Sequence, residues 1–324
     1  MRFLKTAVLA LCAGVATMAA PVLAATDFPS KPIRIIAPSS AGGVLDLISR
    51  MVGDKLSKQL NSPVVVENMP GGGGIIGIQG MLRAEPDGHT LVMGSLGPNA
   101  ANYTLYNNLP YTHADFAPVI NVTSMANVLV VNPSLPVKDL ASLQEYAKSR
   151  NGEIAMAIST IGASGHLSGE MVKAELGFPA INVVYKGAAP ALTDLVGGQV
   201  HFMVDNMITA KPLIESGRLR GLAVFTPERS PLLPDLPTVG EQGFPQLTAG
   251  TWLGLFASAK TPPEIVKKLN VELNKVLADP EVKQAIIQRG GNPVGGTPEE
   301  FEKFIQDETA RWHTVITKAG IKVQ

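Results

Sequence analysis

The chain of 324 residues carries 27 basic and 27 acidic side chains, so its formal net charge is zero. This balance argues against the strongly basic surface that nucleic acids or anionic membranes attract, and the chain has no charged block and no low-complexity tract. The length permits a large hydrophobic core and favours two domains.

Residues 1–24 have the pattern of a secretory signal peptide. Arg2 and Lys5 precede an apolar segment at 7–20, and Val22-Leu23-Ala24 fits a small-residue cleavage site. The apolar segment is shorter than the roughly 20 residues of a stable membrane span. We expect cleavage before Ala25, which leaves 25 basic against 27 acidic residues, a net charge of −2. Modification of Cys12 by lipid is the alternative, although Leu11 is larger than a usual lipobox allows.

The pattern beyond the leader alternates strands and helices, which predicts an α/β fold with largely parallel sheets. In the first part we expect strands at 33–37, 64–67 and 90–94, and helices at 44–60 and 75–83. In the second part we expect strands at 119–122, 127–131, 154–158, 181–185, 200–205 and 221–225, and helices at 140–150, 164–176, 189–196 and 207–216.

A proline-rich loop follows, and the last strand is expected at 252–257. The rest of the chain is predicted to be helical, at 263–277, 280–289 and 298–319, because prolines stand where helices begin and glycines where they end. We expect the chain to build one lobe from 25–124 and 250–324 and a second from 125–249. Crossover segments at 122–127 and 247–252 would form a hinge, with a ligand cleft between the lobes.

The first candidate site is the loop at 38–43, where a strand runs directly into a helix. Ser39 and Ser40 supply hydroxyls, and Ala41, Gly42 and Gly43 let a ligand approach the backbone. Free N–H groups and the positive end of a helix dipole favour a small anion, a carboxylate as much as a phosphate. The alternative is an ordinary turn with a serine cap.

The second candidate repeats this design on the other lobe. Ser159, Thr160 and Gly162 follow a strand, and Ser164 opens the next helix. Two such loops could grip the two ends of one anion, or Ser164 could simply cap its helix. His166 falls in the first turn of that helix, where a structural role is favoured over a catalytic one.

Two further candidates stand at strand ends. Ser95 follows a strand at the edge where α/β proteins bind ligands, although a simple turn would also explain it. Asp205 would repel a carboxylate unless it pairs with a ligand amine, receives backbone N–H bonds or acts through water. Lys186 is expected to be solvated.

Other chemistry has little support in the sequence. The segment 72–77 matches G-x-G-x-x-G, but the next strand ends in Gly94-Ser95 without the acidic residue that a dinucleotide site needs. The chain has no G-x-S-x-G elbow, and its histidines lack metal-site spacing. We expect no cofactor and no metal.

Ordered motifs along the chain resemble the Bug receptors, the extracytoplasmic solute-binding proteins of tripartite tricarboxylate transporters. They lie at 28–34, 41–43 with Asp46, 64–68, 70–71, 86–88, 185–187, 195–200 (LVGGQV), 234–239 (PDLPTV) and 293–301. The resemblance implies a type II periplasmic binding protein that closes on a carboxylate held by 38–43 and covered by 159–164, with Asp205 near the ligand. The chain departs from the family's common pattern at Ser39-Ser40, where an aromatic residue followed by proline is frequent, and at Val44-Leu45, where smaller or polar residues are usual. The first departure bears on the size and polarity of the pocket.

We therefore expect a periplasmic, monomeric binding protein rather than an enzyme. Its ligand would be a di- or tricarboxylate, an acidic amino acid or an aromatic acid, and its partners the membrane subunits of a tripartite transporter. Two alternatives stay open: a ligand sensor for a two-component histidine kinase, and an exported hydrolase with Ser159 or Ser164 as nucleophile.

Overall fold

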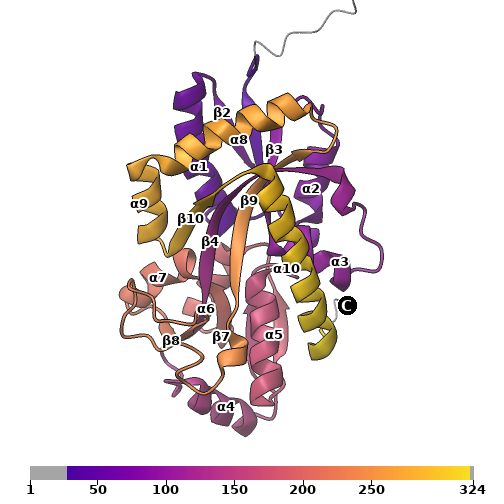
Figure 1. Ribbon diagram of the computed structural model, residues 1–324. Helices are drawn as coiled ribbons and strands as arrows, with labels where there is room; N and C mark the ends of the chain where they lie inside the picture. Colours follow the sequence, from indigo (N-terminus) through magenta and orange to yellow (C-terminus); the bar gives the residue numbers. More distant parts are fainter. Residues whose placement is uncertain (1–27, 322–324) are drawn as a thin grey trace, which may run out of the picture.

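The computed structural model describes residues 28–321, and the expected signal peptide lies outside them. Two α/β lobes lie one above the other, and two long strands pass between them (Figure 1). Among the described residues, no helix combines the length and the apolar character that crossing a membrane requires. The alternating α/β architecture predicted from the sequence is confirmed.

The strands form one ten-stranded sheet in the order β2-β1-β3-β9-β4-β7-β5-β6, with β8 and β10 also paired to β4. Within each lobe the first strands are parallel, and antiparallel pairs join at β4 and β9. The strands are β1 (Ile33–Ala37), β2 (Val64–Asn68), β3 (Thr90–Ser95), β4 (Phe116–Val131), β5 (Ala155–Ile158), β6 (Ile181–Val184), β7 (Phe202–Asn206), β8 (Arg220–Val224), β9 (Gly250–Ser258) and β10 (Gly291–Gly295).

Helices pack along the sheet and turn their apolar stripes inward. They are α1 (Val44–Leu60), α2 (Ile75–Leu82), α3 (Asn102–Leu105), α4 (Leu140–Ser149), α5 (Ser164–Leu176), α6 (Ala188–Val196), α7 (Met207–Glu215), α8 (Pro263–Ala278), α9 (Pro280–Gln288) and α10 (Pro298–Ala319). Short helical turns lie at Gly72–Gly74, Gly97–Ala101, His113–Asp115 and Pro245–Leu247. Helices α8, α9 and α10 each begin with a proline. Proline is tolerated there because N–H groups in the first turn have no acceptor within the helix, so no hydrogen bond is lost.

Two predictions about the strands were wrong. The segments 119–122 and 127–131 belong to one continuous strand, β4, whose residues 116–126 pair with β9 and whose residues 127–131 pair with β7. The end of the chain is also not all helical, because β10 pairs with β4 across residues 121–125. Neighbouring strands pair with β4 on both sides and keep its polar middle in the strand conformation. The sequence pattern alone predicts that the strand is interrupted there.

Each lobe has its own apolar core, and the two lobes also touch. Ile35, Leu91 and Leu253 belong to one buried cluster, while Phe202 and Leu222 belong to another. Leu167 of α5 is fully buried in a third cluster that contains Trp252 of the first lobe. The two lobes are therefore packed against each other around the site.

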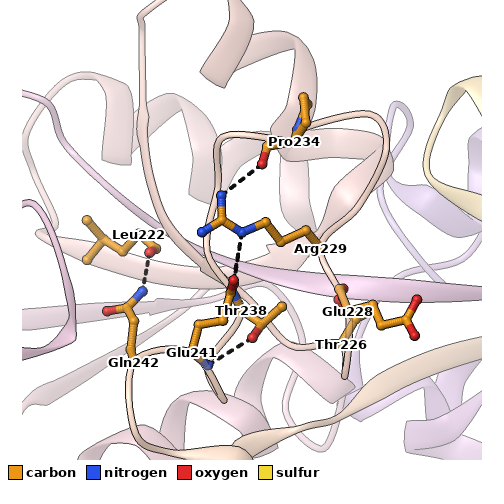
Figure 2. A network of polar contacts seen from close by, with 8 residues as sticks. All are labelled: Leu222, Thr226, Glu228, Arg229, Pro234, Thr238, Glu241 and Gln242. Carbon is orange, nitrogen blue, oxygen red and sulfur yellow. Dashed lines mark hydrogen bonds and ion pairs between the residues drawn. The ribbon is translucent and has the colours of Figure 1, made fainter.

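The proline-rich connection between β8 and β9 is held by polar contacts. Figure 2 shows Arg229 between Glu241, whose two carboxylate oxygens accept from its Nε at 2.9 Å, and Pro234, whose carbonyl accepts from Nη1 at 3.0 Å. Glu241 also accepts the Thr238 N–H at 2.7 Å, and Gln242 Nε2 donates to the Leu222 carbonyl at 2.7 Å. These bonds fix the segment that leads the chain back into the first lobe.

Candidate ligand-binding site

A small cavity of about 40 Å³ lies where the two lobes meet. Loops that follow strands of both lobes form its walls, the edge at which open α/β sheets bind ligands. The first lobe contributes Ser39, Gly43, Val44, Leu45, Ser95, Thr251 and Leu253, and the second contributes Ser159, Thr160, Ala163, Ser164, Gly187, Ala188, Asp205 and Asn206.

The first loop uses part of its backbone to hold its own shape. The Gly42 N–H donates to Asp46 Oδ2 at 2.8 Å, and the Gly43 N–H donates to the Ser40 carbonyl at 3.1 Å. Gly42 adopts a φ of +78°, which favours glycine. Helix α1 then begins without a side-chain cap, so no side chain accepts from its first-turn N–H groups, and its first residues Val44 and Leu45 line the cavity.

The second loop has the same hydrogen-bond pattern. The Gly162 N–H donates to His166 Nδ1 at 3.0 Å, the Ala163 N–H donates to the Thr160 carbonyl at 3.2 Å, and Gly162 also has a φ of +78°. Burial lowers the pKa of His166, so the ring is neutral and Nδ1 can accept this bond. His166 therefore holds the loop, in agreement with the structural role that its position favours.

A buried amide ties the second loop to the crossing strand. Asn127 of β4 accepts at Oδ1 from Ser164 Oγ at 3.1 Å and from Asn206 Nδ2 at 2.8 Å. Its own Nδ2 donates to Ser168 Oγ at 3.1 Å, and the residue is fully buried. The sequence analysis did not single out Asn127, because it stands within a strand and its partners come from α5 and β7, which pack against β4 only in the folded structure.

Asp205 lies at the end of β7 and is only 4 % exposed. Burial raises the pKa of its carboxyl to about 6, against the opposing effects of the Thr209 hydroxyl, which donates to Oδ2 at 2.6 Å, and of the Asn206 backbone. No basic side chain within the described range 28–321 lies within ion-pair distance of Asp205. Lys186, as expected, is exposed to solvent.

Glycines let the lobes approach each other around the cavity. A Cβ on Gly187 would lie 2.1 Å from Ser40 Oγ of the first lobe. In the other direction, a Cβ on Gly97 would lie 3.2 Å from the Gly162 carbonyl oxygen of the second lobe. These contacts place the loops of the two lobes directly against each other.

The structure brings together most of the residues proposed from the sequence. Ser39, Gly43, Ser95, Ser159, Thr160, Ser164 and Asp205 line the cavity, whereas Ser40, Ala41, Gly42 and Gly162 do not. The N–H groups of Gly42 and Gly162 instead donate hydrogen bonds to Asp46 and His166 of the helical turns that follow. Gly187 and Asn206 were not proposed as ligand contacts, although each lies within two residues of a strand end expected from the sequence, at 185 and 205.

The glycine-rich segment at 72–77 serves packing. A Cβ on Gly77 would lie 2.7 Å from Pro38 Cγ, and one on Gly74 would lie 3.2 Å from Pro98 Cγ. The Gly73 carbonyl accepts from Asn102 Nδ2 at 3.1 Å. Within residues 28–321, no group of three His, Cys, Asp or Glu side chains is arranged to hold a metal ion.

Two α/β lobes that share crossing strands, with a polar cavity between strand-end loops, define a solute-binding protein. The sequence model described as tripartite tricarboxylate transporter family receptor, TctC, matches residues 48–321. The chain belongs to this family. Protein BugT of Bordetella pertussis is 37 % identical over 321 residues, which is 98 % of each chain. The resemblance to Bug receptors is confirmed.

Solved structures agree with this assignment. The periplasmic binding protein BugD is 33 % identical with a TM-score of 0.88, over 92 % of this chain and 100 % of BugD. An R. palustris protein solved with adipate is 36 % identical with a TM-score of 0.88, over 91 % and 99 % of the two chains. MatC of Rhodopseudomonas palustris, solved with malate, is 32 % identical with a TM-score of 0.86, over 89 % and 100 %. The chain is thus a binding receptor and not an enzyme.

Proposed function

We propose that this receptor captures a small carboxylate in the periplasm and delivers it to the membrane subunits of a tripartite tricarboxylate transporter. The observation that carries the proposal is the uncapped start of α1, whose first residues Val44 and Leu45 line a cavity shared by both lobes. A helix N-terminus of this kind stabilises an anion. The adipate and malate held by two relatives support a carboxylate.

The lobes would move as units of 25–124 with 250–324, and of 125–249. Ligand clefts usually measure about 300–1,000 Å³, far more than the 40 Å³ seen here. We infer that the lobes open about the crossings at 122–127 and 247–252 to admit the ligand, and that closure follows because the ligand prefers the closed cleft. Export through a signal peptide at 1–24 would place this cycle in the periplasm.

The first experiment screens the purified mature protein against carboxylates by thermal shift, with neutral sugars and inorganic cations as controls. A ligand at 100 times its dissociation constant should add about 2.7 kcal/mol to the free energy of unfolding. If sugars or cations raise the melting temperature and no carboxylate does, the proposal is wrong.

A matched pair of variants then tests the start of α1. Val44→Pro removes one N–H at the first helical position, where proline is well tolerated, and the extended Gly43 before it (φ −76°, ψ 166°) is compatible with proline. Val44→Ala keeps the N–H and loses a similar apolar contact. Because a hydrogen bond to a charged group contributes about 1.5–3 kcal/mol, Val44→Pro should bind the carboxylate at least about tenfold more weakly than Val44→Ala. Equal carboxylate affinities of the two variants would contradict a role for the start of α1 in ligand binding.

A further inference from the structure

Two polar atoms of the first lobe lie under the second lobe and have no hydrogen-bond partner within residues 28–321. They are Oγ of Ser40, in the loop before α1, and Oδ1 of Asn102, at the start of α3. Both atoms are shielded from solvent, and the whole Asn102 side chain is buried. Removing such an oxygen from water without giving it a protein partner costs free energy.

The residues that cover Ser40 belong to the second lobe. A Cβ on Gly187, which directly precedes α6, would lie 2.1 Å from Ser40 Oγ and 2.9 Å from Ser40 Cβ. The first turn of α6 lies over the same loop, since a Cβ on Gly42 would be 3.9 Å from Ala189 Cβ. The Ser40 hydroxyl is therefore shut off from water only while the two lobes are together.

Asn102 is covered in the same way at another point of the interface. A Cβ on Gly162 of the second lobe would lie 2.5 Å from Asn102 Oδ1. The Asn102 amide is held in this orientation because its Nδ2 donates to the Gly73 carbonyl at 3.1 Å. Its oxygen therefore faces the second lobe, and a second glycine covers a second unpaired oxygen.

The Ser40 side chain does not hold its own loop. The Ser40 carbonyl accepts from the Gly43 N–H at 3.1 Å and from Ser39 Oγ at 3.3 Å, so the backbone of Ser40 makes these bonds. Ser40 is also absent from the residues that line the cavity. Removing its hydroxyl therefore keeps the hydrogen bonds of the loop and leaves the cavity wall in place.

We propose that the Ser40 hydroxyl opposes closure of the receptor and does not bind the ligand, and that Asn102 Oδ1 adds to the same cost. The inference rests on the proposed opening and closing of the lobes and deepens it. Water solvates both oxygens in the open receptor, and closure removes that water without a replacement. The ligand must offset this cost, so a residue outside the cavity holds the empty receptor open and sets ligand affinity.

The variant Ser40→Ala tests the proposal because the two roles for Ser40 predict opposite signs. A buried polar group left unpaired costs about 1–3 kcal/mol, which is about 5- to 150-fold in an equilibrium constant. Without the hydroxyl, closure should become at least about fivefold more favourable, and the ligand should bind more tightly by the same factor. A hydroxyl that held the ligand would weaken binding when removed.

Isothermal titration calorimetry would measure malate and adipate, the acids with which two relatives were solved. Ser40→Ala should raise the affinity for both acids by the same factor, because the changed group touches neither. Ser149→Ala makes the same change at an exposed position on α4, outside the cavity, and should leave both affinities unchanged.

A second measurement needs no ligand. The expected mature chain has no cysteine, so Thr193→Cys can carry a single nitroxide on the exposed face of α6. Paramagnetic relaxation of amide protons at the start of α1 then reports how often the lobes are together. The ratio of closed to open receptor should rise at least about fivefold when Ser40→Ala is added to this labelled protein.

The outcomes separate this proposal from carboxylate capture. If Ser40→Ala weakens binding, or changes the malate and adipate affinities by different factors, Ser40 contacts the ligand and the proposal is wrong. An unchanged closed-to-open ratio would also overturn it. If neither acid binds the wild type, carboxylate capture loses its support, and the relaxation measurement alone decides whether Ser40 opposes closure.

Discussion

The backbone N–H of Gly42 donates to Asp46 Oδ2 at 2.8 Å, so a residue of the first helical turn holds the loop that precedes it. The second lobe repeats this arrangement with another acceptor, since the Gly162 N–H donates to His166 Nδ1 at 3.0 Å. In both loops the acceptor stands four residues after the glycine. One loop is therefore closed by a carboxylate and the other by an imidazole.

Removal of the Asp46 carboxylate should destabilise the folded protein. Burial alone would raise its pKa, but the Gly42 N–H, Arg50 and Asn68 outweigh burial and leave the pKa below its usual value. We expect Asp46→Ala to lower the free energy of unfolding by about 2–3 kcal/mol in urea denaturation. The control Asp54→Ala changes an exposed aspartate on the same helix. Equal losses in the two variants would contradict a special role for Asp46.

The His166 loop should weaken in acid. Burial lowers the pKa of His166 in the folded protein, so as pH falls below about 6.5 the unfolded chain takes up the proton first. The His166 contribution to the free energy of unfolding should therefore fall as pH drops from 7.5 to 5, and the difference between the wild type and His166→Gln should shrink over that range. A constant difference would mean that His166 does not titrate in this window.

Asp205 should have the opposite pH dependence. Its folded pKa of about 6 lies above the unfolded value of about 3.8, so between these values the folded protein binds the proton more tightly. The Asp205 contribution to the free energy of unfolding should fall by about 3 kcal/mol as pH rises through this window. Urea denaturation of the wild type and Asp205→Asn at pH 4 and pH 7.5 measures this change, and a difference of the opposite sign would contradict it.

Gly97 tests whether the two lobes must come together. A Cβ at Gly97 would lie 3.2 Å from the Gly162 carbonyl oxygen, so the larger Gly97→Leu side chain should hold the lobes apart. We expect carboxylate affinity to fall at least about tenfold and the radius of gyration with ligand, measured by small-angle X-ray scattering, to rise. Gly197→Leu is the control, because its nearest neighbour, the Thr193 carbonyl oxygen, is 3.5 Å from the added Cβ. Unchanged affinity in Gly97→Leu would contradict the need for closure at this contact.

Local signals were sufficient for much of the fold. Helices α1 and α5 begin and end where the sequence analysis placed them, because small residues precede each one and Asn61 or Gly177 ends it in the left-handed conformation. Strand β10 was missed because its sequence, Gly-Asn-Pro-Val-Gly, has little strand propensity and is held by its partner β4. Such pairing depends on residues far apart in the chain.

The location of the site could be predicted from the sequence, whereas the hydrogen bonds made by its individual groups could not. Loops after strands indicated where Ser39, Ser95, Ser159, Ser164 and Asp205 would meet. What each polar group does inside its loop depends on three-dimensional partners that the sequence does not reveal. The Gly42 and Gly162 N–H groups appeared free for a ligand and are used by residues four positions later. Whether the cavity residues contact the ligand stays a prediction.

The pairing of β4 with β9 also bears on how this architecture could have arisen. Ala126 and Gly250 are the last register partners before the chain enters the second lobe, so it leaves and re-enters the first lobe at one point. A two-residue turn between them would make β4 and β9 an ordinary β-hairpin. In evolutionary terms, the second lobe occupies the place of a hairpin loop. Gain or exchange of the segment that forms the second lobe could therefore change one lobe of the receptor and leave the hydrogen bonding of the first lobe intact.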